Sequence, residues 1–156
     1  MRIYVKEDGY LDSIHYPFVE KDGTEIYAEI EDQSLILVEG APEPENGLMR
    51  WDFEEGKWLE PSPEVRRAAM PSLTKKAFKF GLIDNDIDPA LIDSYIDSIA
   101  DQKERMKARV NWDDTTTVSR TDEMVVAISA SPEFNLSPEQ VDAMWSDAYQ
   151  NYMAVI

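Results

Sequence analysis

Regularly spaced acidic residues are the side chains in this sequence whose types could do chemistry. Asp84, Asp86 and Asp88 alternate along the chain as the first three ligand positions of a calcium-binding EF-hand loop do. The sixth position of such a loop needs glycine and the twelfth needs glutamate, but Pro89 and Tyr95 stand there. We therefore interpret this segment as an interhelical turn in which Asp88 caps the following helix.

A second acidic series, Asp93, Asp97 and Asp101, has helical spacing and would lie on one helix face. A metal site there would need ligands from another element, whereas a solvated face needs nothing more, so we predict a solvated face. Because 32 of the 156 residues are Asp or Glu, no particular pair of carboxylates indicates glycosidase chemistry. A hydrolase that uses carboxylates and a metal is kept as an alternative hypothesis.

Nucleophilic catalysis has few candidate residues. The sequence has no cysteine, which excludes thiolate nucleophiles, thiolate metal sites and disulfides. Its single histidine, His15, lies near the end of a predicted strand, and no nucleophile with an orienting acid can be assigned to it. No glycine-rich phosphate-binding loop is present. The residues alone therefore name no reaction, and the sequence predicts no catalytic residue, no metal site and no cofactor.

Aromatic side chains on a predicted hairpin are the candidates for contact with a partner. Trp51 and Trp58 stand on two predicted strands that flank the turn at residues 54–56. A small sheet has little protein to cover its second face, so one of these tryptophans could anchor a partner. The alternative is that both pack within the sheet or against the helices. The predicted partner-binding residues are Tyr10, Trp51, Phe53 and Trp58.

The net charge restricts the classes of partner. Fifteen Lys and Arg stand against 32 Asp and Glu, which gives a formal net charge of −17. Binding to a phosphate backbone or to anionic lipid needs clustered Lys and Arg, so we expect no direct nucleic-acid binding and no membrane binding. No apolar run approaches the ~18 residues of a membrane span, and the N-terminus lacks a signal-peptide pattern. We expect a protein that is made and kept in the cytoplasm.

The elements that would position these residues form two modules. Residues 1–60 predict a small antiparallel β-meander, because short apolar or alternating runs are separated by Asp-Gly, Asn-Gly and proline-containing turns. Pro61 and Pro63 stop the last strand, and we expect residues 61–69 to be a linker. The expected strands lie at residues 2–6, 10–15, 24–30, 35–38, 48–53 and 57–60.

Residues 70–156 predict a compact all-helical module of about five short helices, which gives an α+β fold class. Gly81 marks the end of the first helix, and Asp88 with Pro89 starts the second. The last helix follows a capping box in which Ser137 is the N-cap and Gln140 is the third helical residue.

Two more helices are expected between these. One spans residues 101–112, with Met106, Val110 and Trp112 facing inward. The other begins at Thr121 or Asp122 and carries a short apolar run.

Three stretches of the helical module carry a family resemblance. They are a Pro-x-Leu-Thr opening at residues 71–74, an Arg-x-x-Trp-Asp stretch at 109–113 and a Leu-Ser-x-Glu-Gln-x-Asp helix start at 136–142. Together they resemble a helical module found near the C-termini of small tail proteins of tailed phages and prophages. The resemblance implies a protein without enzymatic activity.

The first module resembles the N-terminal region of tail-fibre assembly proteins. The matching features are a strand-Asp-Gly-strand start around Gly9, the Pro-Glu-Pro-Glu-Asn-Gly segment at residues 42–47 and the Trp-Asp-x-x-x-Gly-Lys-Trp hairpin at 51–58. This resemblance implies an assembly chaperone or a virion accessory part that binds a tail-fibre or other tail subunit. Such a protein would act in the cytoplasm of the bacterial host or be incorporated into the virion tail.

Two other interpretations of the acidity are kept. An acidic decoy would block a basic host protein by imitating the phosphate charge of nucleic acid, and the net charge of −17 fits this. Decoys need acids ordered on one face, however, and Lys and Arg are interspersed through residues 66–109. The acid excess could also reflect a saline habitat and have no functional meaning.

Overall fold

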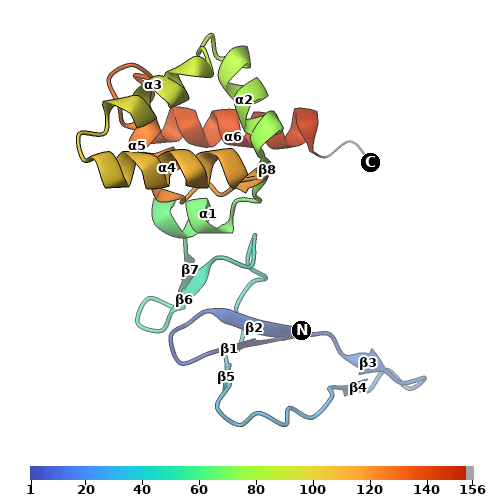
Figure 1. Cartoon of the computed structure of the whole chain (residues 1–156). Coiled ribbons are helices and arrows are strands. Elements are labelled where there is room, and N and C mark those ends of the chain that lie inside the picture. Colours follow the sequence, from blue (N-terminus) through green and yellow to red (C-terminus); the bar gives the residue numbers. More distant parts are fainter. Residues whose placement is uncertain (154–156) are drawn as a thin grey trace. The chain divides into compact units, whose positions relative to one another are not determined.

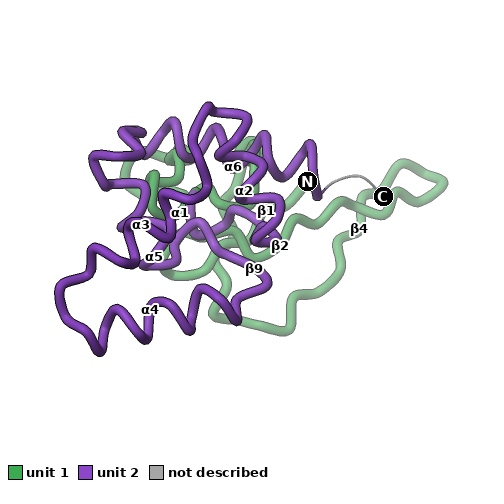
Figure 2. The backbone as a smooth tube through the Cα atoms, turned by 45° about the horizontal axis from the view of Figure 1, so that its top comes forward, with its two compact units in different colours: residues 1–66 green, residues 67–156 purple. Residues whose placement is uncertain are grey.

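A computed structural model describes residues 1–153 and confirms the α+β fold class. The chain divides into two compact units, residues 1–66 and 67–156, which Figure 2 shows in green and purple. Short strands joined by long loops and turns form the first unit, and helices make up most of the second (Figure 1). The division falls within the segment 61–69 that the sequence analysis expected to be a linker.

The strands of the first unit form one three-stranded sheet and two two-stranded ribbons, in place of a single meander. The sheet has the order β2-β1-β5, and the ribbons pair β3 with β4 and β6 with β7, all antiparallel. Residues 27–30, expected to continue a strand, are not paired. The bounds are Arg2–Val5 (β1), Leu11–His15 (β2), Phe18–Val19 (β3), Glu25–Ile26 (β4), Ile36–Leu37 (β5), Arg50–Asp52 (β6) and Lys57–Leu59 (β7).

The first unit has a small core around its central strand, β1. The buried cluster consists of Ile3, Val5, Val38, Ala41 and Trp51. The turn between β1 and β2 is fixed against β6, because the backbone N–H of Trp51 donates to the carbonyl of Gly9 at 2.8 Å. Gly9 has a φ of +85°, and a Cβ there would lie 2.4 Å from the carbonyl oxygen of Trp51. Only glycine both adopts a positive φ without strain and lacks the Cβ that would collide with Trp51.

The sequence analysis did not predict two elements: a helix, α1, that crosses the boundary between the two units, and a ribbon in the second unit, so this module is not all-helical. Helix α1 occupies most of the expected linker, because Pro63 is favourable as a first helical residue and the Ser62 hydroxyl accepts from the N–H of Val65 at 3.4 Å. Strands β8 and β9 pair in antiparallel register. The bounds are Pro63–Ala69 (α1), Leu73–Thr74 (β8), Lys75–Asp84 (α2), Ala90–Ser98 (α3), Gln102–Asp114 (α4), Thr117–Val118 (β9), Glu123–Ser129 (α5) and Pro138–Tyr152 (α6).

Helix α2 does not end at Gly81, as the sequence analysis expected, but continues to Asp84. A Cβ on Gly81 would lie 2.9 Å from the Cβ of Ala148 on α6, so the glycine permits close packing of the two helices. Phe78 packs beside Trp145, with ring centroids 5.6 Å apart. The Trp145 indole N–H donates to the carbonyl of Pro71 at 2.8 Å, which satisfies its one polar atom inside the core.

Helix α4 presents a different face to the core from the one expected. Met106 and Val110 are 60% and 57% exposed, whereas Trp112 is buried. The orientation is fixed by polar contacts: Arg105 donates to the carbonyl of Ile99 at 2.7 Å, and Arg109 binds the carboxylates of α3. The inward positions predicted for Met106 and Val110 are therefore wrong, and only Trp112 is a core residue.

One charged side chain among residues 1–153 is buried, that of Arg120. Its Nε donates to Asp142 of α6 at 2.7 Å, and its guanidinium also donates to the carbonyl of Pro138 at 3.2 Å. Asp142 accepts a second hydrogen bond, at 2.9 Å, from Arg67. This cluster joins the segment after β9 to α1 and α6, and it satisfies a charge that would be costly to bury alone.

We predict that Asp142→Ala lowers the free energy of unfolding of the helical unit by about 3–5 kcal/mol, because it leaves Arg120 buried without its counter-charge. Asp147→Ala is the matched control, since Asp147 is exposed on the same helix and its loss should change stability by less than about 0.5 kcal/mol. Urea titration followed by helical circular dichroism measures both. Equal stability of the two variants would contradict the assigned role of the cluster.

A second prediction compares two turn glycines. Gly9→Ala and Gly23→Ala both place a side chain at a positive φ, +85° and +88°, which costs about 1–2 kcal/mol in each case. Only Gly9 is also crowded by backbone, because nothing lies within 4 Å of a Cβ on Gly23. Hydrogen exchange of the Trp51 amide should therefore accelerate in Gly9→Ala and stay nearly unchanged in Gly23→Ala. Equal exchange in both variants would show that the turn is not held by β6.

Candidate functional site

The acidic residues of the EF-hand-like segment have separate structural roles. Asp84 accepts a hydrogen bond from the Tyr152 hydroxyl at 2.7 Å. Asp88 accepts from the N–H of Ala90 at 2.9 Å, in the capping role expected for it. Asp86 lies between them with a positive φ of 59°. The three carboxylates are thus not arranged around a common point, and no group of three or more potential metal ligands occurs among residues 1–153.

The residues of the second acidic series all contact helix α4. Asp93 and Asp97 of α3 both bind Arg109, with an Arg109–Asp97 distance of 2.7 Å. The hydrogen bonds to Asp97 and Asp93 raise the pKa of the Arg109 guanidinium, and the bond to Asp97 has the larger effect. Asp101 is the N-cap of α4 and accepts from the N–H of Glu104 at 2.9 Å. The series therefore holds α3 and α4 together, which its spacing alone did not indicate.

His15 has a local structural environment. Its Nε2 lies 3.2 Å from the Ser13 hydroxyl on the same strand, and its ring packs edge-on against Tyr4 with centroids 5.4 Å apart. Ser13 is two residues away, and no carboxylate among residues 1–153 is hydrogen-bonded to the ring, so these contacts do not form a triad.

The predicted aromatic residues do not form one exposed surface. Trp51 is only 9% exposed and packs edge-on against Trp58, with centroids 5.2 Å apart. The Trp58 indole donates to the carbonyl of Pro42 at 2.7 Å, and Tyr10 forms a backbone bridge with Arg50.

Phe53 differs from the other three predicted partner-binding residues. At 48% exposure, it is the one of the four whose side chain lies largely in solvent.

An exposed apolar surface lies instead on the ribbon formed by β3 and β4. We call residues 16–26 the β-arm; Figure 1 shows β3 and β4 extending away from the β1–β2 pair. Phe18 is 72% exposed, and Ile26 is directly opposite it in the antiparallel register. Tyr16 and Val19 are also exposed. Exposed large apolar side chains gathered within eleven residues of chain are characteristic of an interaction surface.

The β-arm is shaped by its turn and by one tether. The N–H of Glu20 donates to the carbonyl of Thr24 at 2.9 Å, and Asp22 accepts from the N–H of Thr24 at 2.9 Å. The Thr24 hydrogen bonds hold the pKa of Asp22 below its usual range. At the base, the Tyr16 hydroxyl donates to Glu43 at 2.9 Å, which raises the pKa of Tyr16. The arm therefore has a defined conformation even though it buries little surface.

The backbone of the β-arm has open edges. Each strand pairs only with the other, so the outward N–H and C=O groups of β3 and β4 have no strand partner among the described residues. A two-stranded ribbon without further strands is marginally stable, and unpaired edges are sites where another chain can add a strand. The arm thus combines hydrogen-bonding edges with apolar side chains.

The surroundings of the β-arm are acidic. Residues 20–45 contain nine Asp or Glu and one Lys. In the arm itself, Glu20, Asp22 and Glu25 stand near Lys21 and the apolar side chains. A partner with Lys or Arg flanking an apolar strand would complement this charge.

The sequence analysis missed the β-arm for a physical reason. The alternation at residues 24–30 predicted a half-buried strand, but Glu25 and Ile26 are both exposed because no other element covers either face. Phe18 and Val19 follow Pro17 and precede acidic residues, a context that favoured a loop. An apolar pair isolated between a proline and an acidic Asp-Gly turn is the signal that could have indicated the arm.

Comparison with family models, with curated proteins and with solved structures found no match for this chain. None of the helices within residues 1–153 has the length and apolar character needed to cross a bilayer.

We predict that the turn of the β-arm loosens in acid. The lowered pKa of Asp22 means that its carboxylate stabilises the fold above the ordinary value of about 3.9, and that this contribution is lost as the pH falls through the folded-state value. The Thr24 amide resonance, followed by NMR, should titrate with a midpoint below about 3.9. The titration should disappear in Asp22→Asn. A midpoint at or above the ordinary value would contradict the hydrogen-bonded turn.

Proposed function

We propose that this chain is a non-enzymatic tail-assembly or tail-accessory protein of a phage or prophage, which binds a tail-fibre or other tail subunit through the β-arm. The observation that carries the binding role is the exposed Phe18–Ile26 pair on a ribbon with two open edges. The assignment to a phage tail is supported by the resemblance of residues 71–74, 109–113 and 136–142 to phage tail proteins.

Strand addition is the mode of binding that fits the β-arm best. A strand of the client would hydrogen-bond to the outer edge of β3 or β4, which gives affinity without catalytic groups. Phe18 and Ile26 would then lose their exposed apolar surface against the client, at about 1.5–3 kcal/mol per fully buried side chain. The client would in turn have an unpaired edge of its own covered during assembly.

The acidity has two roles in this proposal. Residues 1–66 carry a net charge of −11 and residues 67–156 a net charge of −6, from 6 basic and 17 acidic residues in the first and 9 and 15 in the second. Like charge on every copy opposes pairing between the exposed arms of two copies, which would otherwise compete with the client. The same charge favours encounter with a client that is basic around its strand.

The proposal places the protein in the cytoplasm of the bacterial host while tails assemble, with incorporation into the virion tail as the other outcome. Detection of the chain in purified particles decides between these two. Neither location changes the binding surface that the proposal requires.

We predict that Phe18→Ser and Ile26→Ser each weaken binding to the tail-fibre or other tail subunit by about tenfold or more, because each removes an apolar side chain that the client covers. Phe53→Ser is the matched control, since Phe53 is also exposed but lies on the β6–β7 hairpin of the same unit. Calorimetry with purified subunits of the tail measures all three. An effect of Phe53→Ser with no effect of the other two would move the site to the hairpin predicted from sequence.

Salt dependence separates this function from the acidic decoy. Apolar strand pairing should change little between about 0.05 M and about 0.5 M salt, whereas binding driven by phosphate-like charge should fall steeply. A chain that binds no tail subunit, and that binds a basic nucleic-acid-binding protein only at low salt, would overturn the proposed function.

A further inference from the structure

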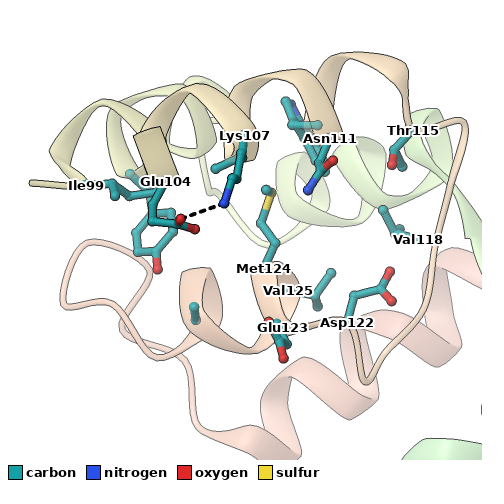
Figure 3. A pocket seen from close by; sticks show the side chains of 14 residues that line it. Ile99, Glu104, Lys107, Asn111, Thr115, Val118, Asp122, Glu123, Met124 and Val125 are labelled. Carbon is teal, nitrogen blue, oxygen red and sulfur yellow. Dashed lines mark hydrogen bonds and ion pairs between the residues drawn. The ribbon is translucent and has the colours of Figure 1, made fainter. Parts of the chain in front are cut away.

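The second unit contains a groove that the proposed function does not use. It has a volume of about 620 Å³ and runs between α4 and α5. Tyr95 of α3 and Ile99, the C-cap residue of α3, also line it. Figure 3 shows side chains from both helices directed toward the space between them. The volume is within the range of sites that take a ligand or several side chains of a partner.

The floor of the groove is apolar. Trp112, Val118 and Val125, which line it, also belong to the buried core. Met124 extends from α5 toward α4 across the middle of the groove (Figure 3). A methionine at this position can change conformation to fit an entering side chain at little cost, because its side chain is unbranched and flexible.

The rim of the groove is acidic. On the α4 side, Lys107 is ion-paired with Glu104 at 2.8 Å, so these two charges offset each other (Figure 3). On the α5 side, Asp122 and Glu123 also line the groove, and Asp122 accepts a hydrogen bond from the N–H of Ser119 at 2.6 Å. Among the lining residues the cation is Lys107, which is paired with Glu104, so the lining carries three acidic side chains against one basic side chain. An occupant therefore meets an apolar floor and a rim with an excess of negative charge.

We propose that this groove binds an amphipathic helical segment of a partner protein, with apolar side chains entering over Met124 and with Lys or Arg placed against Asp122 and Glu123. A helix lying in a groove buries one apolar face and leaves its basic residues at the rim. Charge complementarity favours a basic segment as the occupant of the groove, and charge repulsion disfavours the acidic β-arm of another copy as its occupant. Together with the β-arm, the groove would allow one chain to hold two partner segments.

A second copy of this chain is the main competitor as occupant. The outer face of α4 carries Lys103 beside the exposed Met106 and Val110, so it is itself basic and apolar. The net charge of −17 on each copy opposes such pairing. The test below therefore includes the oligomeric state.

The experiment uses the full chain and a synthetic Leu/Lys amphipathic peptide about four helical turns long. A peptide with the same leucines and with Glu in place of Lys is the control ligand. Amide chemical shifts and calorimetry are measured for both. We expect the Leu/Lys peptide to shift resonances of α4 and α5 and to bind at least about tenfold more tightly than the Leu/Glu peptide.

Two neighbouring substitutions on α5 provide the matched comparison. Ala127→Lys puts a positive charge into the groove lining, whereas Val126→Lys puts the same charge on an exposed side chain outside it. Ala127→Lys should weaken binding of the Leu/Lys peptide by about tenfold or more, and Val126→Lys by less than about threefold. Circular dichroism establishes that both variants fold.

Three results would overturn the inference. The first is equal binding by the two lysine variants, and the second is a peptide footprint confined to the acidic residues of the first unit. The third is concentration-dependent dimerisation in sedimentation that Ala127→Lys removes, which would assign the groove to a second copy. Phe18→Ser should leave peptide binding unchanged, so a failure of this site is distinguishable from a failure of the proposed β-arm function.

Discussion

The small core of the first unit is the constraint on which the rest of the account depends. Five buried residues, Ile3, Val5, Val38, Ala41 and Trp51, form its cluster around a three-stranded sheet. A unit of this size buries a smaller share of its apolar surface than a larger domain does. The β3–β4 ribbon lies outside the cluster, so Phe18 and Ile26 are left in solvent and two strand edges are left open. A partner can therefore cover the apolar side chains and the strand edges of this ribbon, which no other part of the first unit covers.

The second unit differs from the first because it has a large core, and several ion pairs join its helices to one another. Asp142 pairs with both Arg67 and Arg120, and Arg109 joins α3 to α4 through Asp93 and Asp97. Arg120 lies two residues before Asp122, the N-cap of α5, so its ion pair attaches the segment that leads into α5 to α6. One wall of the groove between α4 and α5 is therefore a helix, α4, that bridging charges attach to α3. Many of the acidic residues that suggested metal or decoy chemistry have such structural roles.

Local signals in the sequence predicted the elements well where the signal and the packing agree. The capping box at Ser137 and Gln140 is present, and the Asp-Gly turns lie where they were expected. The errors arose where tertiary contacts determine the structure. Gly81 lies within α2, where it permits close packing against α6, and does not end the helix. Arg105 and Arg109 bind groups at α3, and Met106 on the same helix faces solvent. The candidate site was harder to predict, since exposure of an apolar strand depends on which elements fail to cover it. Trp51 was selected for its residue type, yet it is a core residue.

The central claim is that the chain acts by pairing its β-arm with a strand of another protein, without making or breaking a covalent bond. Amide hydrogen exchange of the full chain, alone and mixed with the tail-fibre subunit, tests this directly. The account predicts that amides of residues 16–26 become protected in the mixture, because their open edges acquire hydrogen bonds. Unchanged exchange throughout residues 16–26, together with protection elsewhere in the chain, would contradict it.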